Sequence, residues 1–231
     1  MGVGMCTFPL VLFWLSRGAG FFAECNGYFK QHGLTFHNYH DIYGHLPPAY
    51  ILNDQGQPVF SWRVLVMPVQ EEQKMYNRFH LNEPWNSAHN QSVCETRTKE
   101  YGINTYQCPA DTHAGKNNTS AVMPVGPETI SDGPHTKKLS DITDGTAHTI
   151  MLGEMSQSGI HWMEPRDLKT DEMSFKINDK TRPSFRSMHP GKVNMLFCDG
   201  GVRTVKDDID PKVLKAAITI SGGEPPADFD N

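Results

Sequence analysis

The sequence predicts an α+β fold in which an N-terminal helix packs on an antiparallel sheet. An apolar and aromatic stripe with helical spacing begins near residue 22. Near the carboxyl end, two short apolar runs flank Asp199-Gly200-Gly201, which is the pattern of a β-hairpin. The chain also has 16 prolines and 20 glycines among 231 residues, which favours many turns over a helix bundle. We therefore expect long loops and short helices inserted between the helix and the hairpin.

The first predicted element is an amphipathic helix over residues 22–43. Its apolar and aromatic side chains recur at alternating spacings of three and four residues, so they share one stripe of the helix. Gly44 and Pro47-Pro48 end the pattern. The stripe consists of Phe22, Cys25, Phe29, His32, Phe36, Tyr39 and Tyr43.

The residues before this helix, 1–21, are interpreted as a degenerate or truncated leader segment. Residues 8–15 are apolar, but Pro9 interrupts the run and Arg17 follows it. A bilayer-spanning helix needs about 20 apolar residues, so this run is too short. It also lacks the basic region with which a signal peptide begins. We expect membrane association only if a leader helix lies upstream.

The middle of the chain predicts several short elements. Residues 62–79 keep a helical spacing across Pro68, which indicates two short helices, the second opened by Pro68 with Glu71 and Glu72 in its first turn. Residues 82–90 read as a loop that leads into a polar helix. Residues 106–111 are expected to form a strand that leads into a turn. Further strands are expected at 121–125 and 149–154, and a polar loop is expected at 175–184.

The hairpin is the predicted centre of the sheet, with strands at 193–198 and 202–205. Both faces of its first strand are apolar, and such a strand is covered on both sides and therefore central. One face carries Val193, Met195 and Phe197, and the other carries Leu196 and Cys198.

A short helix is predicted after the hairpin, at residues 211–220, with Asp210 as its N-cap and Pro211 at its first position. The sequence shows no internal repeat and no linker. We therefore expect one domain over residues 22–225 and a tail at 226–231.

Charge and cysteine content exclude some classes of function. The formal net charge is −5 without a basic block, so nothing in the sequence points to nucleic acid. None of the five cysteines forms a Cys-x-x-Cys motif, which argues against a zinc knuckle or a thioredoxin-like site. Cys94 and Cys108 could pair if the protein is exported. Cys25 and Cys198 are interpreted as small buried apolar residues.

The pair His189 and Asp199 has residue types that suit catalysis, but its spacing argues against that role. If the strand between them is extended at about 3.3 Å per residue, the two side chains lie on the order of 20 Å apart. We therefore predict that Asp199 stabilises the hairpin turn and that His189 is a capping or packing residue.

A second cluster contains His37, His40 and His45, of which the first two lie three residues apart on one helix face. A zinc site needs three or four converging ligands, so this spacing is a weak metal candidate. We expect these side chains to pack or to form hydrogen bonds instead. No cofactor is predicted, because nucleophile motifs and a phosphate-binding glycine loop are missing from the sequence.

Aromatic residues could line a ligand groove. Trp85, Trp162 and Tyr50 are the candidates for a groove that binds sugars or peptides. Scattered tryptophans, including Trp62, more often fill a core and bond a loop carbonyl through the indole N–H, and we favour that reading.

The carboxyl-terminal stretch also carries a family resemblance. His189, nine further residues and then Asp199-Gly200 resemble the signature of a planctomycete prepilin-like family of unknown function, domain of unknown function 1559, which is also filed as a bacterial solute-binding-protein-like family. The resemblance runs from Cys25 to Glu224. Further matching blocks lie at 37–41, 46–50, 61–65, 82–90, 142–146 and 161–168, and they include Trp62, Trp85 and Trp162.

This resemblance implies a pilin-like fold and a non-catalytic pilin-like or pseudopilin-like protein of the cell envelope, with a structural or assembly role. Its partners would be envelope, secretion or pilus-like assembly proteins. The family's prepilin leader is not matched in this sequence. An extracytoplasmic module that binds a sugar or a peptide is the alternative, and a metal-assisted hydrolase using His37, His40 and His45 is the third.

Overall fold

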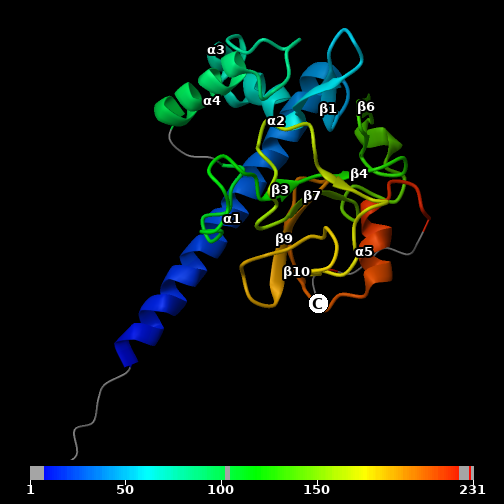
Figure 1. Cartoon of the computed structure of the whole chain (residues 1–231). Helices are drawn as coiled ribbons and strands as arrows, with labels where there is room; N and C mark the ends of the chain where they lie inside the picture. Colours follow the sequence, from blue (N-terminus) through cyan, green and yellow to red (C-terminus); the bar gives the residue numbers. More distant parts are fainter. Residues whose placement is uncertain (1–7, 102–104, 224–228, 230–231) are drawn as a thin grey trace, which may run out of the picture.

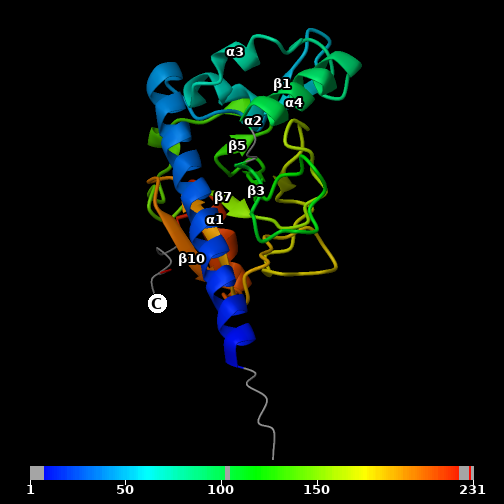
Figure 2. The same cartoon turned by 90° about the vertical axis from the view of Figure 1, so that its left-hand side faces the viewer.

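The computed structural model describes residues 8–101, 105–223 and 229. Its first element, α1 (Phe8–Tyr43), is a helix of 36 residues. One half of α1 lies along the body of the protein and the other half projects from it (Figures 1 and 2). The predicted end of the helix is confirmed, because Gly44 has a φ of 75° and its N–H donates to the His40 carbonyl. The predicted start at residue 22 is wrong, since the helix already begins at Phe8; residues 1–7 lie outside the described residues.

The central sheet has four antiparallel strands in the order β10-β9-β7-β3. The hairpin is present as predicted, and β9 is an inner strand between β10 and β7. Val202 pairs with Leu196 and Val205 pairs with Val193, which fixes the register of the hairpin. The bounds are β3 Ala121–Val122, β7 Ile150–Glu154, β9 Lys192–Phe197 and β10 Val202–Lys206.

The two faces of β9 face two separate apolar clusters, as their alternation predicts. Leu196 and Cys198 belong to the cluster that contains Phe29 and Phe36 of α1. On the other face, the cluster is completed by α5 (Pro211–Ile218). The sheet is thus a layer between α1 on one side and α5 on the other (Figure 1). The second cluster includes Val193, Met195 and Phe197 together with Leu214, Ala217 and Ile218.

The start of α5 is built as the sequence predicts. The Asp210 side chain accepts a hydrogen bond from the Lys212 N–H, and Pro211 occupies the first helical position. Such a cap satisfies one of the backbone donors that a helix start leaves free. Of the expected tail, Phe229 is described, and its ring packs against Phe197 with the centroids 5.0 Å apart.

The segment between α1 and the sheet consists of short elements and loops. Strands β1 (Tyr50–Leu52) and β2 (Pro58–Ser61) form a hairpin. Two two-stranded pairings follow later in the chain, β4 with β8 and β5 with β6. The remaining bounds are α2 Trp62–Leu65, η1 Met67–Gln70, α3 Gln73–Tyr76, α4 Ala88–Tyr101, β4 Pro124–Val125, β5 Ser131–Asp132, β6 His135–Thr136, η2 Leu139–Asp141 and β8 Leu168–Lys169.

Two local predictions for this segment are wrong. Residues 106–111 form turns rather than a strand. Pro68 is the second residue of a 3₁₀ helix and does not open a longer α-helix, because Glu71 adopts a left-handed φ of 64° and ends the turn. Glu71 and Glu72 consequently lie between η1 and α3 and not in a first helical turn. The polar helix after residues 82–90 is confirmed as α4.

A buried ion pair connects these insertions to the sheet region. Arg63 of α2 donates to both carboxylate oxygens of Asp167, at 2.6 and 3.2 Å, and to the carbonyl of Ala121. Both charged side chains are almost fully buried. Because hydrogen bonds to the Ala121 carbonyl and from the Met123 N–H surround the pair, its charges are matched, and α2 is fixed to the loop around residue 167. Within the described residues, no helix is both long and apolar enough to cross a membrane.

Candidate functional site

The signature residues His189 and Asp199 lie at opposite ends of β9. Asp199 belongs to the hairpin turn, where its carboxylate accepts hydrogen bonds from the Gly201 N–H and from the Arg203 guanidinium. Gly200 has a φ of 81°, which favours glycine because it has no side chain. His189 is instead buried at the start of the strand, among residues far from the turn. The turn role predicted for Asp199 and the packing role predicted for His189 agree with these contacts.

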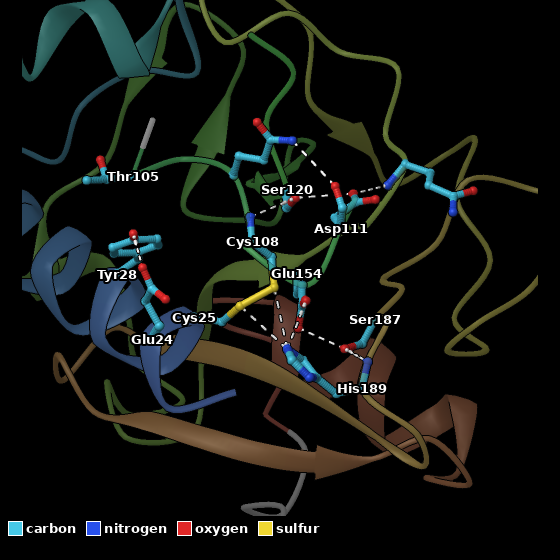
Figure 3. Close-up of a disulfide and its surroundings, with 12 residues drawn as sticks. Glu24, Cys25, Tyr28, Thr105, Cys108, Asp111, Ser120, Glu154, Ser187 and His189 are labelled. Atoms are coloured by element: carbon cyan, nitrogen blue, oxygen red, sulfur yellow. Dashed lines mark hydrogen bonds and ion pairs between the residues drawn. A yellow bond between two sulfur atoms is a disulfide. The ribbon is translucent and has the colours of Figure 1, made fainter. Parts of the chain in front are cut away.

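His189 lies against a disulfide between Cys25 of α1 and Cys108 of the segment before β3 (Figure 3). Its Nε2 atom is 3.4 Å from the sulfur of Cys108 and 3.5 Å from that of Cys25. Its ring also makes an edge contact with Phe22, at a centroid distance of 5.0 Å. His189 thereby joins the start of β9 to the first buried turn of α1.

The disulfide corrects two cysteine predictions. Cys25 is buried but bonded, and Cys108 pairs with it rather than with Cys94. Cys94 is a free buried thiol that accepts a hydrogen bond from the indole N–H of Trp162, and burial raises its pKa. Cys198 is a free buried thiol, as predicted. Because the bond closes a loop over a sequence separation of 83 residues, the chain-entropy model assigns it roughly 4.5 kcal/mol of stabilisation.

Glu154, at the end of β7, is the fourth buried member of this cluster and was not predicted from the sequence. Its Oε2 atom accepts a hydrogen bond from the Ser187 hydroxyl, while Oε1 lies 3.9 Å from His189 Nε2. Loss of solvation raises the pKa of this carboxyl to about 7, and the negative charge of Asp111 acts in the same direction. The hydrogen bond from Ser187 opposes the shift. The structure therefore holds an ionisable carboxyl beside a disulfide and an imidazole.

The other end of the signature also contacts α1. A β-carbon added at Gly33 of α1 would lie 3.2 Å from the Gly200 carbonyl oxygen and 2.9 Å from a methyl carbon of Leu196. A β-carbon at Gly200 would lie 3.4 Å from the ring of His37. The hairpin turn therefore approaches the helix backbone closely where the helix has a glycine. Both ends of the signature hold β9 against α1.

The three histidines proposed as metal candidates do not form a ligand group. The His40 ring accepts a hydrogen bond from the Leu139 N–H, and the His45 ring lies 2.9 Å from the Leu46 carbonyl. His37 lies beside Gly200. In the described stretches, the side chains whose ligand atoms meet within 4.8 Å of one another are instead Cys25, Cys108, Glu154 and His189.

The aromatic groove candidates separate into core and surface. Trp162 is wrong as a groove residue, because it is 1% exposed and packs inside the main cluster, as does Trp62. Trp85 and Tyr50 do share a hollow of about 990 Å³, and the Trp85 indole is stacked on His161. The walls of this hollow come from the inserted loops, and they include Pro58, Val125, Gly133, His135, Arg166, Lys169 and Asp171.

With the fold and these contacts established, comparison with known proteins assigns a family. The model of a family of proteins of unknown function, DUF1559, matches residues 23–175 and 157–212. The chain belongs to this family, which also carries a solute-binding-like label. No curated protein and no solved structure matches the chain.

The sequence contained one signal for the missed residues. Cys25 falls on the buried stripe of α1, so its burial was predictable, but nothing in its spacing identifies Cys108 as its partner. Glu154 ends an apolar strand, where a carboxylate usually marks the boundary with solvent. Its burial depends on Ser187 and His189, which are more than thirty residues away in sequence.

Two glycines of α1 provide a test of the close approach between helix and hairpin. Gly27→Ala places its methyl group in open space, so we expect the free energy of unfolding to rise by about 0.5–1 kcal/mol through helix propensity. Gly33→Ala gains the same propensity but forces Leu196 and the Gly200 backbone to move, so we expect it to destabilise the protein. Urea unfolding of the two variants measures both effects. Stabilisation by both substitutions would contradict the close packing at Gly33.

Glu154 gives a prediction about pH. Because its pKa is about 7 in the folded chain and 4.5 unfolded, the folded state holds more protons between these values, and its stability falls as pH rises through this window. The slope is at most about 1.4 kcal/mol per pH unit. The variant Glu154→Gln has no carboxyl group to titrate at this position, so its stability does not fall in this way. Its free energy of unfolding relative to the parent should therefore increase from pH 4.5 to 7. Urea unfolding of the disulfide-bonded protein with a chelator measures this difference.

The histidines His32 and His161 act in the opposite direction. Burial lowers the pKa of both to about 4, so they favour the folded state above pH 6.5 and lose this effect as pH falls towards 4. Their contribution is common to parent and variant and therefore cancels in the difference. A difference that stays constant from pH 4.5 to 7 would show that Glu154 titrates normally.

Proposed function

We propose that this protein is a non-catalytic, pilin-like protein of the cell envelope with a structural or assembly role. The observation that carries the proposal is α1, of which one half is held on the sheet while the other projects from the body (Figure 1). A helix arranged in this way offers neighbouring subunits a long rod without disturbing the fold that carries it. The body holds this rod by apolar packing and by a disulfide.

The disulfide supports an extracytoplasmic location. Bonds of this kind persist in oxidising compartments and are rare in the cytoplasm. The bond between Cys25 and Cys108 is buried, and it joins α1 to the body. The solute-binding-like label of the family is in keeping with such a location.

The outer face of α1 supports a role in assembly. Leu34 and Ile42 are 63% and 64% exposed, and Tyr43 is 49% exposed. These three are most of the large apolar side chains that the described part of the chain leaves exposed; the others are Leu52 and Met188. Apolar side chains concentrated on one helix are a common mark of a protein contact surface. At about 100° per residue, Leu34 and Ile42 share a face of α1, whereas Tyr43 is turned away from it. We infer that the face with Leu34 and Ile42 packs against a neighbouring subunit or an assembly protein.

The double substitution Leu34→Glu with Ile42→Glu tests this proposal. Both side chains are exposed, so we expect the melting temperature to change little. Association should nevertheless be lost, because the new carboxylates cannot be buried in an apolar contact without a large desolvation cost. Sedimentation of the full-length protein and crosslinking in its native cells measure association.

The matched control is Gln55→Glu with Ser92→Glu, which adds the same charge at exposed polar positions outside α1. This control should retain association. Unchanged association in the Leu34/Ile42 variant, or equal loss in both variants, would argue against an apolar contact through α1.

A solute-binding module is the second candidate, and the hollow beside Trp85 favours it. Its volume of about 990 Å³ falls within the range of small-molecule sites. Tyr50 and Trp85 provide aromatic surface, while Arg166, Lys169 and Asp171 provide polar groups at the same hollow. Aromatic surface beside a few polar groups is a combination that suits sugars and short peptides.

Thermal unfolding with a panel of sugars and peptides tests the second candidate. A ligand of the hollow should raise the melting temperature. The substitution Trp85→Ala should raise the dissociation constant of that ligand by roughly tenfold, because the contact with the ring is lost. Tyr43→Ala, which removes an exposed aromatic ring that does not line the hollow, should leave the affinity unchanged. Equal effects of both substitutions would place the ligand elsewhere.

A further inference from the structure

The disulfide cluster contains the side chains of a metal site. Cys25, Cys108, Glu154 and His189 each offer one ligand atom, and these four atoms lie within 4.8 Å of one another. All four residues are buried. They come from α1, the segment before β3, the end of β7 and the loop before β9, so four parts of the chain converge here (Figure 3).

Glu154 is the member of the cluster whose charge has the weakest compensation. Its residue is fully buried. The Asn194 N–H and the Ser156 hydroxyl lie near enough to this carboxylate to lower its pKa, but Oε1 forms no hydrogen bond of good geometry within the described structure. Burying a carboxylate oxygen without a donor is costly unless a positive charge lies close to it. The nearest cationic group would be the His189 ring, at 3.9 Å, which is longer than a hydrogen bond. Oε1 therefore points towards the two sulfurs and the imidazole without a partner of its own.

The distances between these atoms resemble the edges of a zinc tetrahedron. Zn²⁺ binds sulfur at about 2.3 Å and nitrogen or oxygen at about 2.0–2.2 Å, which gives edges of roughly 3.3–3.8 Å in a tetrahedral site. His189 Nε2 lies 3.4 and 3.5 Å from the two sulfurs and 3.9 Å from Glu154 Oε1. The distances from Glu154 to the two sulfurs are within 4.8 Å. The bond between the sulfurs is too short for an edge of the tetrahedron, and reduction removes it.

We propose that the reduced chain binds one Zn²⁺ through Cys25, Cys108, His189 and Glu154. A dithiol reductant gives two electrons and two protons to the disulfide, which becomes two thiols while the reductant becomes a disulfide. Zn²⁺ then displaces one proton from each thiol, and both leave to solvent. Two thiolates, one carboxylate and a neutral imidazole complete a tetrahedral site of a type that proteins use for structural zinc.

The surroundings of the ligands are suited to this role. The Ser187 hydroxyl donates to Glu154 Oε2, which orients that carboxylate, and it accepts from the backbone N–H of His189, which fixes the chain next to that ligand. Outer-shell contacts of this kind usually accompany metal ligands. The metal and the disulfide exclude each other but join the same two segments. The chain thus has two ways to fix α1 on its body, one for reducing and one for oxidising surroundings.

Cobalt spectroscopy of the full-length protein tests the site directly. The protein is reduced with a dithiol, separated from it by gel filtration under argon, and titrated with Co²⁺ alone. We expect thiolate-to-cobalt charge transfer and visible bands of tetrahedral intensity that reach a plateau at one Co²⁺ per chain. Added Zn²⁺ should remove these bands, and the disulfide-bonded protein should show none.

Four variants assign the ligands. Cys25→Ser and His189→Ala should each weaken Co²⁺ binding by more than about 100-fold, whereas Ser187→Ala should weaken it by about 10–100-fold, the range of outer-shell changes. Cys94→Ala removes a buried free thiol outside the cluster and should leave the spectrum unchanged. Bands that survive Cys25→Ser, or that vanish in Cys94→Ala, would overturn the assignment.

If reduction unfolds the chain, circular dichroism of the reduced protein with and without Zn²⁺ provides the test. In that case Zn²⁺ should restore the native spectrum of the reduced parent and raise its melting temperature, without restoring Cys25→Ser. A reduced chain that stays folded without tetrahedral cobalt bands, or that stays unfolded with Zn²⁺ present, would overturn the inference. The result is independent of the proposed envelope role, which the α1 surface variants test separately.

Discussion

The packing of α1 along β9 is the contact on which the rest of the structure depends. The signature fixes this contact at both ends, because His189 meets Phe22 and the disulfide while Gly200 approaches Gly33. A six-residue strand spans about 20 Å. The stretch of α1 from Cys25 to His37 rises by about 18 Å. The spacing between the histidine and the Asp-Gly turn thus corresponds to the length over which strand and helix lie together.

The features that the sequence predicts well are those with local causes. The faces of β9 follow from alternation, the Asp-Gly turn from the need for a positive φ at Gly200, and the start of α5 from its aspartate cap and its proline. The inner position of β9 follows from having two apolar faces. Each of these inferences uses neighbours within about ten residues, so no knowledge of the tertiary fold was needed.

The features that escaped prediction depend on contacts between distant segments. Cys25 and Cys108 are 83 residues apart, and their pairing requires the segment before β3 to cross α1. The same holds for the tryptophans, since Trp162 is enclosed by the core while Trp85 lines a hollow, and the loops that decide this are distant in sequence. Composition and periodicity indicate which residue types tend to be buried. They do not give the position of the covering loops.

The signature and the hollow belong to different parts of the fold, and this separation bears on both functional candidates. None of His189, Asp199 and Gly200 lines the hollow, whose walls come from loops inserted between α1 and the hairpin. The signature therefore serves the scaffold, since its residues hold α1 to the sheet whatever the loops contain. Changes in the loops can alter a ligand without disturbing that scaffold, because loops tolerate variation better than packed elements do. The stretch from His189 to Gly200 consequently accounts for how this chain holds α1 on its sheet, whereas the inserted loops are the place to look for what it binds.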